Sequence, residues 1–193
     1  MTQLETIVIA TAGLALLPGV AVAQSAPAPS GIYTPKTQPQ QPPLRVEVID
    51  GARFRDIETR IVYRLYGIDT CAPGQTARLG RQPWPCGAMA VAWLVTATLN
   101  KWLACGCVRA DGEEQIVRCA TAGHADLAAD MLHDGVAVLA PSRPGDLEIP
   151  SYAAAQAEAR KAYRGLWSST FEMPWEWRAR HDRQSASDTE VVR

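Results

Sequence analysis

The sequence predicts an α+β domain that is mainly β, built as a five-stranded, OB-like Greek-key barrel with about three helices. Five short segments alternate apolar and polar residues or are rich in β-branched and aromatic residues, which is typical of strands. Three longer Ala- and Leu-rich segments have helical length and spacing. No β-α-β unit repeats, so a small closed barrel is favoured over a parallel sheet.

The predicted strands are 44–50, 53–57, 60–68, 102–110 and 115–121. The first ends at Asp50-Gly51, and the last two flank Asp111-Gly112, both of which are turn signals. Gly67 is expected to bend the third strand near its end. A long loop, 69–86, is expected between the third strand and the first helix.

The predicted helices are 87–99, 125–133 and 151–163. The first contains only apolar and small residues and is expected to be buried. The last follows Pro150, could be capped by Ser151 and stops before Gly165. A short apolar stretch, 136–139, follows the second helix.

Outside this domain, predicted to span 44–180, the chain has three segments of different composition. Residues 1–23 resemble a signal peptide ending in Ala21-Val22-Ala23, although Glu5 replaces the usual basic residues. A misassigned start or an uncleaved interfacial helix is the alternative. Residues 24–43 hold six prolines and predict an extended linker, and the polar residues 181–193 predict a disordered tail.

The charge balance argues against electrostatic capture of nucleic acid. The chain has 19 basic and 20 acidic residues, and Glu5 is the only charge in the first 23 positions, so leader cleavage would leave no net charge. Such a protein has no overall field that would collect phosphate backbones, so strong nucleic-acid binding is not expected. No membrane span is expected after leader cleavage.

Five cysteines lie within 49 positions of the predicted domain. They lack zinc-ligand spacing, so two disulfides and one remaining thiol are expected in an oxidising compartment. The predicted disulfide residues are Cys71, Cys86, Cys107 and Cys119. Cys105 is the alternative to Cys107, because strand alternation places both on one face. Burial of all five as thiols in a cytosolic protein is the other interpretation.

Six phrases in order resemble the staphylococcal nuclease (thermonuclease) family over about residues 45–178. They are Val48–Gly51, Arg64–Asp69, Asp126-Leu127, Gly135–Ala137, Tyr152–Trp167 and Phe171–Arg178. This resemblance implies a five-stranded OB barrel with three helices, in agreement with the pattern of elements. Fold resemblance does not by itself establish an activity.

Members of that family hydrolyse nucleic-acid phosphodiesters with Ca²⁺, two metal-binding carboxylates, a general-base carboxylate and two arginines. The resemblance carries one arginine onto Arg64 and one metal carboxylate onto Asp69, with Thr70 beside it to offer a carbonyl. The first metal carboxylate, the base and the second arginine fall on Ala52, Ala72 and Gln115. One carboxylate is a poor ligand set for Ca²⁺, which takes 6–8 oxygens.

Arg64 and Asp69 are therefore expected to be vestigial, left as an ion pair in the old pocket. Arg53 could contact a phosphate or occupy the cation position. No cofactor is expected; Ca²⁺ enters only under the alternative of a weak calcium-dependent nuclease.

The phrase Gly67–Cys71 together with Trp84–Gly87 is also similar to exported rhizobial members of the family, among them a succinoglycan biosynthesis protein. The resemblance implies a periplasmic or secreted protein with an accessory role in exopolysaccharide biosynthesis. Its partner would be an unknown protein or another component of that polysaccharide pathway.

Overall fold

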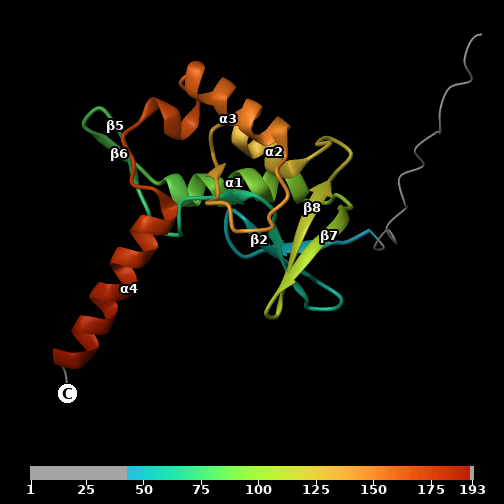
Figure 1. The fold of residues 1–193 in the computed structure, drawn as a ribbon, viewed down its shortest axis with the longest axis horizontal. Coiled ribbons are helices and arrows are strands. Elements are labelled where there is room, and N and C mark those ends of the chain that lie inside the picture. The colour runs from blue at the N-terminus through green and yellow to red at the C-terminus, as the bar shows by residue number, and fades with distance from the viewer. Residues whose placement is uncertain (1–42, 192–193) are drawn as a thin grey trace, which may run out of the picture. The chain divides into compact units, whose positions relative to one another are not determined.

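A computed structural model describes residues 43–191 of the chain, with side chains described through residue 185 (Figure 1). The predicted signal peptide and all but the last residue of the predicted linker lie outside the described residues. None of the helices in the described part is long and apolar enough to cross a membrane.

The main sheet contains the five strands that the sequence predicted. Its strands are β1 (Val46–Val48), β2 (Arg53–Asp56), β3 (Val62–Leu65), β7 (Ala104–Asp111) and β8 (Glu114–Ala120), in the spatial order β1-β2-β3-β8-β7. All neighbours are antiparallel except β3 and β8, which pair in parallel. The α+β class is therefore confirmed.

Closure of the barrel is less complete than predicted. The two edges of the sheet meet only at an isolated antiparallel bridge, in which the backbones of Leu44 and Leu103 exchange hydrogen bonds of 2.8 and 2.9 Å. Among the described residues, β1 forms a ladder with β2 and none with β7. The strand order is thus that of an OB-like barrel, but the sheet is not closed by continuous pairing.

Two smaller pairings complete the β structure. The predicted third strand bends at Gly67, which has a φ of 73°, and continues as β4 (Ile68–Asp69) beside β9 (Val138–Leu139). The region expected to be a long loop instead contains a hairpin of β5 (Ala77–Leu79) and β6 (Gln82–Trp84).

The helices are α1 (Cys86–Thr98), α2 (Leu127–His133), α3 (Pro150–Lys161) and α4 (Pro174–Val191), with a 3₁₀ turn η1 at Gly165–Ser168. α2 and α3 lie against each other, and α4 extends away from them (Figure 1). Ser151 is not a cap, because Pro150 already occupies the first turn of α3. The polar residues after 180 were expected to be disordered, but α4 continues through them to Val191.

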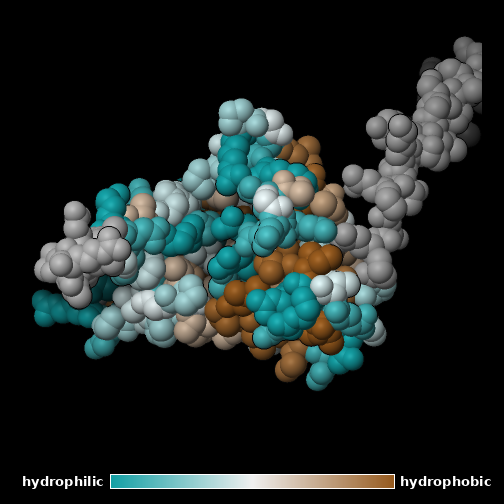
Figure 2. Space-filling view, turned by 90° about the horizontal axis from the view of Figure 1, so that it is seen from below, coloured by the Kyte–Doolittle hydropathy of each residue, from teal (hydrophilic) through white to brown (hydrophobic). Residues whose placement is uncertain are grey.

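α1 is less buried than its apolar sequence predicted. Its buried side includes Ala90 and Leu94, while Met89 and Val95 remain 50% and 38% exposed. Apolar side chains also gather on one part of the molecular surface shown in Figure 2. A sequence without charges therefore did not place the whole helix in the core.

The two disulfides differ in how far the sequence specified them. Cys71–Cys86 is present as predicted, with a Cα–Cα distance of 5.7 Å. The second bridge joins Cys105 to Cys119, so the assignment of Cys107 to this pair is wrong. The register places Cys105 directly opposite Cys119, whereas Cys107 faces Val117 and remains an exposed thiol.

Candidate functional site

The retained acidic residue Asp69 is already bound by an arginine. Asp69 ends β4 and is 8% exposed. Arg178 of α4 binds both of its carboxylate oxygens: Nη1 donates to Oδ1 at 3.1 Å, and Nη2 donates to Oδ2. The backbone amide of Thr70 donates to Oδ1 at 2.9 Å. Asp69 thus pairs with Arg178, not with Arg64 as expected.

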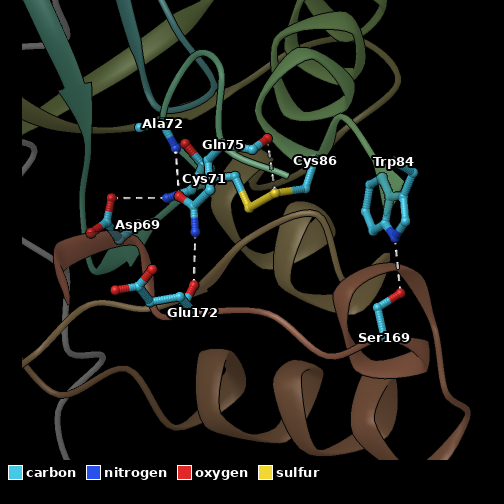
Figure 3. The surroundings of a disulfide bond; sticks show 9 residues. Asp69, Cys71, Ala72, Gln75, Trp84, Cys86, Ser169 and Glu172 are labelled. Atoms are coloured by element: carbon cyan, nitrogen blue, oxygen red, sulfur yellow. Dashed lines mark hydrogen bonds between the residues drawn. A yellow bond between two sulfur atoms is a disulfide. The ribbon is translucent and has the colours of Figure 1, made fainter. Parts of the chain in front are cut away.

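Buried Gln75 connects the loop after Asp69 to the segment that leads into α4 (Figure 3). Its side-chain amide donates to the carbonyl of Glu172 at 2.8 Å, and its Oε1 accepts from the amide of Ala72 at 3.0 Å. Both contacts lie beside the Cys71–Cys86 disulfide. This attachment brings the start of α4 close enough for Arg178 to reach Asp69.

The β5–β6 hairpin holds the same segment a few residues earlier, at Ser169 and Thr170. Trp84 Nε1 donates to Ser169 Oγ at 2.9 Å, and the backbones of Arg78 and Thr170 exchange two hydrogen bonds of 2.9 Å. The disulfide also belongs to a small second core with partly buried Trp84 and Trp175. The segment before α4 is therefore fixed by hydrogen bonds, apolar packing and the adjacent disulfide.

Gly87, at the start of α1, allows this loop to approach the helix. A Cβ at that position would lie 2.0 Å from the carbonyl oxygen of Ala72, a distance at which backbone atoms would have to move. Only glycine therefore fits at this position without displacing the backbone at Ala72.

The retained arginine, Arg64, has a different environment. It lies on β3 directly opposite Arg53 of β2. Arg53 is neutralised, since its Nε donates to Asp50 at 2.6 Å and its Nη1 donates to Glu114 at 3.1 Å. Burial opposes the charge on Arg53, but these two carboxylates raise its pKa overall. Among the described residues, no hydrogen bond or ion pair neutralises the Arg64 guanidinium.

The predicted positions do not all meet at one site. Ala52, Arg64, Asp69 and Ala72 line a cavity of ≈ 190 Å³, which we call the small cavity. Gln115 lies instead on β8, opposite Tyr63, and is not part of this lining. The structure thus brings together four of the five positions that the family resemblance singled out.

These residues do not fit a calcium ion. Ala52 and Ala72 offer no side-chain oxygen, and Asp69 is engaged by Arg178. Asp50 also lines the small cavity, but it already accepts from Arg53 and from the amides of Ala52 and Arg53. Within the part of the chain whose side chains are described, residues 43–185, no group of three or more His, Cys, Asp or Glu side chains is arranged to hold a metal.

A larger cleft of ≈ 730 Å³ shares Arg64, Asp69 and Arg178 with the small cavity, since all three line both. Its outer wall is the segment 139–150, and Tyr66, Tyr152 and Trp175 contribute aromatic surface. Tyr66 donates its hydroxyl to the carbonyl of Leu147 at 2.7 Å. The cleft is therefore large enough for a small organic ligand and combines aromatic with charged surface.

Ion pairs balance most of the charge in this cleft. Arg143 pairs with Asp111 at 2.8 Å, and Arg109 pairs with Asp146. The hydrogen bond from Arg143 lowers the pKa of Asp111, and the backbone amide of Arg143 lowers the pKa of Asp146. Burial, followed by the nearby charge of Asp126, raises the pKa of Tyr152 and keeps its hydroxyl protonated as a donor.

Sequence reasoning did not identify Arg178 as part of the site. The residue closes a phrase that was recognised as family-like, but its partner Asp69 lies 109 positions away. The only available signal was the phrase itself, since no spacing rule connects α4 with β4.

The fold and the site define a mixed α+β, OB-like domain of the nuclease class that lacks a fitting calcium ligand set. The sequence model of the family described as "Staphylococcal nuclease homologue" matches residues 62–169, more than half of the chain. The chain belongs to the staphylococcal nuclease family. A search of curated proteins returned no match, so the similarity to a succinoglycan biosynthesis protein stays a prediction.

Proposed function

We propose that this protein is an exported, non-catalytic member of the family that binds its ligand or partner through the cleft and assists exopolysaccharide biosynthesis. The absence of catalytic activity is supported mainly by one observation: Arg178 forms an ion pair with the Asp69 carboxylate. A carboxylate held on both oxygens by a guanidinium is a poor ligand for a hard divalent cation.

The missing general base and second arginine would each have contributed a large factor to the rate of hydrolysis, and this supports the proposal. General-base catalysis is worth roughly 10²–10⁴-fold, and Ala72 stands where the base would be. Removing one electrostatic stabiliser of a transition state costs roughly 10²–10³-fold in kcat, and Gln115 stands in place of an arginine. Positioning by Arg64 alone would not replace both contributions.

Export is supported by the cysteines. Two disulfides account for four of the five, and such bonds persist mainly in oxidising compartments. A periplasmic or secreted location agrees with the leader-like residues 1–23. The role in exopolysaccharide biosynthesis rests on the resemblance of the Gly67–Cys71 and Trp84–Gly87 phrases to exported rhizobial proteins.

A digestion assay tests the absence of catalysis. Purified protein is incubated with single-stranded DNA and excess Ca²⁺, beside the Arg64→Ala variant and a buffer blank. We expect the two proteins to give the same background as the blank. Calcium-dependent cleavage that Arg64→Ala abolishes would instead establish the weak nuclease.

A deletion strain tests the pathway. We expect the yield of extracellular polysaccharide to fall when the gene is deleted and to return when it is supplied in trans. Complementation by a form lacking residues 1–23 should fail if export is required. An unchanged yield in the deletion strain would remove the pathway assignment and leave the non-catalytic proposal standing.

A further inference from the structure

In the small cavity, the Arg178 guanidinium lies beside Asp69, the one carboxylate retained at a metal-binding position of the family. Arg178 binds both oxygens of Asp69, so the guanidinium charge sits against the carboxylate that would otherwise face a metal. An arginine stays protonated at all physiological pH values. The positive charge at this place is therefore supplied by the chain itself.

Arg178 retains unused hydrogen-bonding capacity. A guanidinium has five N–H donors in a planar fork, and Asp69 accepts one from each terminal nitrogen. The side chain is 37% exposed and lines both cavities. Its remaining N–H groups can reach a second acceptor without releasing Asp69.

The small cavity also has more cations than carboxylates. Arg53, Arg64 and Arg178 line it, against Asp50 and Asp69. Arg53 and Arg64 are directly opposite on β2 and β3, a position in which Cβ atoms lie about 4.5–5.5 Å apart and like charges repel. Asp50 and Glu114 offset Arg53, whereas Arg64 makes no ion pair among the described residues. The Asp111 carboxylate in the cleft feels the charge of Arg64, but it is already paired with Arg143.

From this arrangement we propose that Arg64 and Arg178 form a metal-independent site for an oxyanion, where Arg178 replaces the cation. The ligand carries a phosphate or carboxylate group, which the planar guanidinium forks bind in paired hydrogen bonds. The rest of the ligand lies in the cleft, against Tyr66, Tyr152 and Trp175. This inference rests on the proposed non-catalytic binding function and names the ligand chemistry.

Calorimetry with inorganic phosphate tests the site, in buffer containing excess EDTA and again with Ca²⁺. We expect phosphate to bind equally in both buffers and at least tenfold more weakly to Arg64→Ala. Arg64 makes no ion pair in the described structure, so its removal should leave the fold intact, which circular dichroism checks. Acetate in place of phosphate shows which of the two oxyanions the site prefers.

A second pair of variants tests the role of Arg178. Arg178→Gln should weaken phosphate binding at least tenfold, and Arg178→Lys should restore part of it. Arg180→Ala is the matched control, because Arg180 lies on the same helix, pairs with Glu172 and lines neither cavity. We expect this control to bind phosphate as the wild type does.

Three results would overturn the oxyanion site: no phosphate binding in EDTA, binding that requires Ca²⁺, or binding that Arg64→Ala leaves unchanged. None of these results would contradict the proposal that the protein lacks nuclease activity. The DNA digestion assay tests that proposal separately. Conversely, DNA cleavage would overturn the non-catalytic proposal even if phosphate binds without metal.

Discussion

The small cavity and the large cleft share Arg64, Asp69 and Arg178, yet their outer walls are held by different forces. Cys71 in the wall of the small cavity is tied by a disulfide to the start of α1. In the described structure the 139–150 wall of the cleft has no disulfide and is held by Arg109–Asp146, Arg143–Asp111 and the Tyr66 hydroxyl.

Because of this difference, the walls of the two cavities should respond differently to salt and to acid. A disulfide is insensitive to salt and to mild acid, whereas exposed ion pairs weaken with ionic strength and with protonation of their carboxylates. The small cavity should therefore keep its shape over a wide range of conditions, while the cleft wall can loosen.

The largest effect is expected from removing the disulfide beside the small cavity. The Cys71→Ser, Cys86→Ser double variant should lower the free energy of unfolding by about 3 kcal/mol, the usual value for a loop of this size. Urea denaturation under non-reducing conditions measures the change. Cys107→Ser is the control, because that thiol is exposed and unbridged. Equal stability of the double variant and the control would show that the wall does not depend on the bond.

The second largest effect is expected from breaking the ion pair between Arg178 and Asp69, which line both cavities. Arg178→Ala should lower the free energy of unfolding by on the order of 1–3 kcal/mol, because the buried Asp69 carboxylate loses its charged partner. Adding Asp69→Asn should recover part of that loss, since the uncompensated charge is then absent. A double-mutant cycle measured by thermal unfolding gives the coupling. A coupling energy near zero would contradict the ion pair.

A third test asks whether Arg178 blocks a restored metal site. The triple variant Ala52→Asp, Ala72→Glu, Gln115→Arg returns the family residues, but Asp69 remains bound by Arg178. We expect added Arg178→Gln to raise Ca²⁺ affinity at least about tenfold over the triple variant, equivalent to ~1.4 kcal/mol. Calorimetric titration with CaCl₂ compares the two proteins. Equal affinities would mean that Arg178 does not compete with the metal.

The smallest effect is expected at the cleft wall. The pKa of Asp111 is depressed, chiefly by Arg143, so the ion pair stabilises the fold above the ordinary value of 3.8 and is lost as pH falls through the lowered pKa. Arg143→Ala should raise the pKa of Asp111 toward 3.8, as followed by NMR titration of the carboxyl carbon. Arg180→Ala should shift Glu172 and leave Asp111 unchanged. A titration of Asp111 that is insensitive to Arg143 would contradict the proposed tether.

The elements that the sequence predicted well are those with strong local patterns. β7 and β8 form the expected hairpin, with its turn at Gly112-Glu113, one residue after the predicted Asp111-Gly112. α2 ends at His133, close to Gly135. The β5–β6 hairpin was missed because Gly80, Pro83 and Pro85 are typical of a loop. Its short strands exist because they pair with each other and because Arg78 bridges to Thr170, a contact that lies far away in the sequence.

The second disulfide shows the same limit at a finer scale. Alternation correctly left Cys105 and Cys107 as alternatives, since it gives the face of a strand but not its register. The choice was made by the pairing of β7 with β8, which places Cys105 and not Cys107 opposite Cys119. Register depends on the packing of the whole sheet, so no local pattern could have decided it.

By itself, the sequence determined which chemical groups are available: Arg64 and Asp69 are present, while Ala52, Ala72 and Gln115 have no carboxylate or guanidinium to contribute. The tertiary structure alone decided how the remaining charges are paired. It placed Arg178 on Asp69 and left Arg64 beside two neutralised arginines. The physical reason is that the residue types are set position by position along the chain, whereas an ion pair depends on distances between residues far apart in sequence, here Asp69 and Arg178, which only the folded chain establishes.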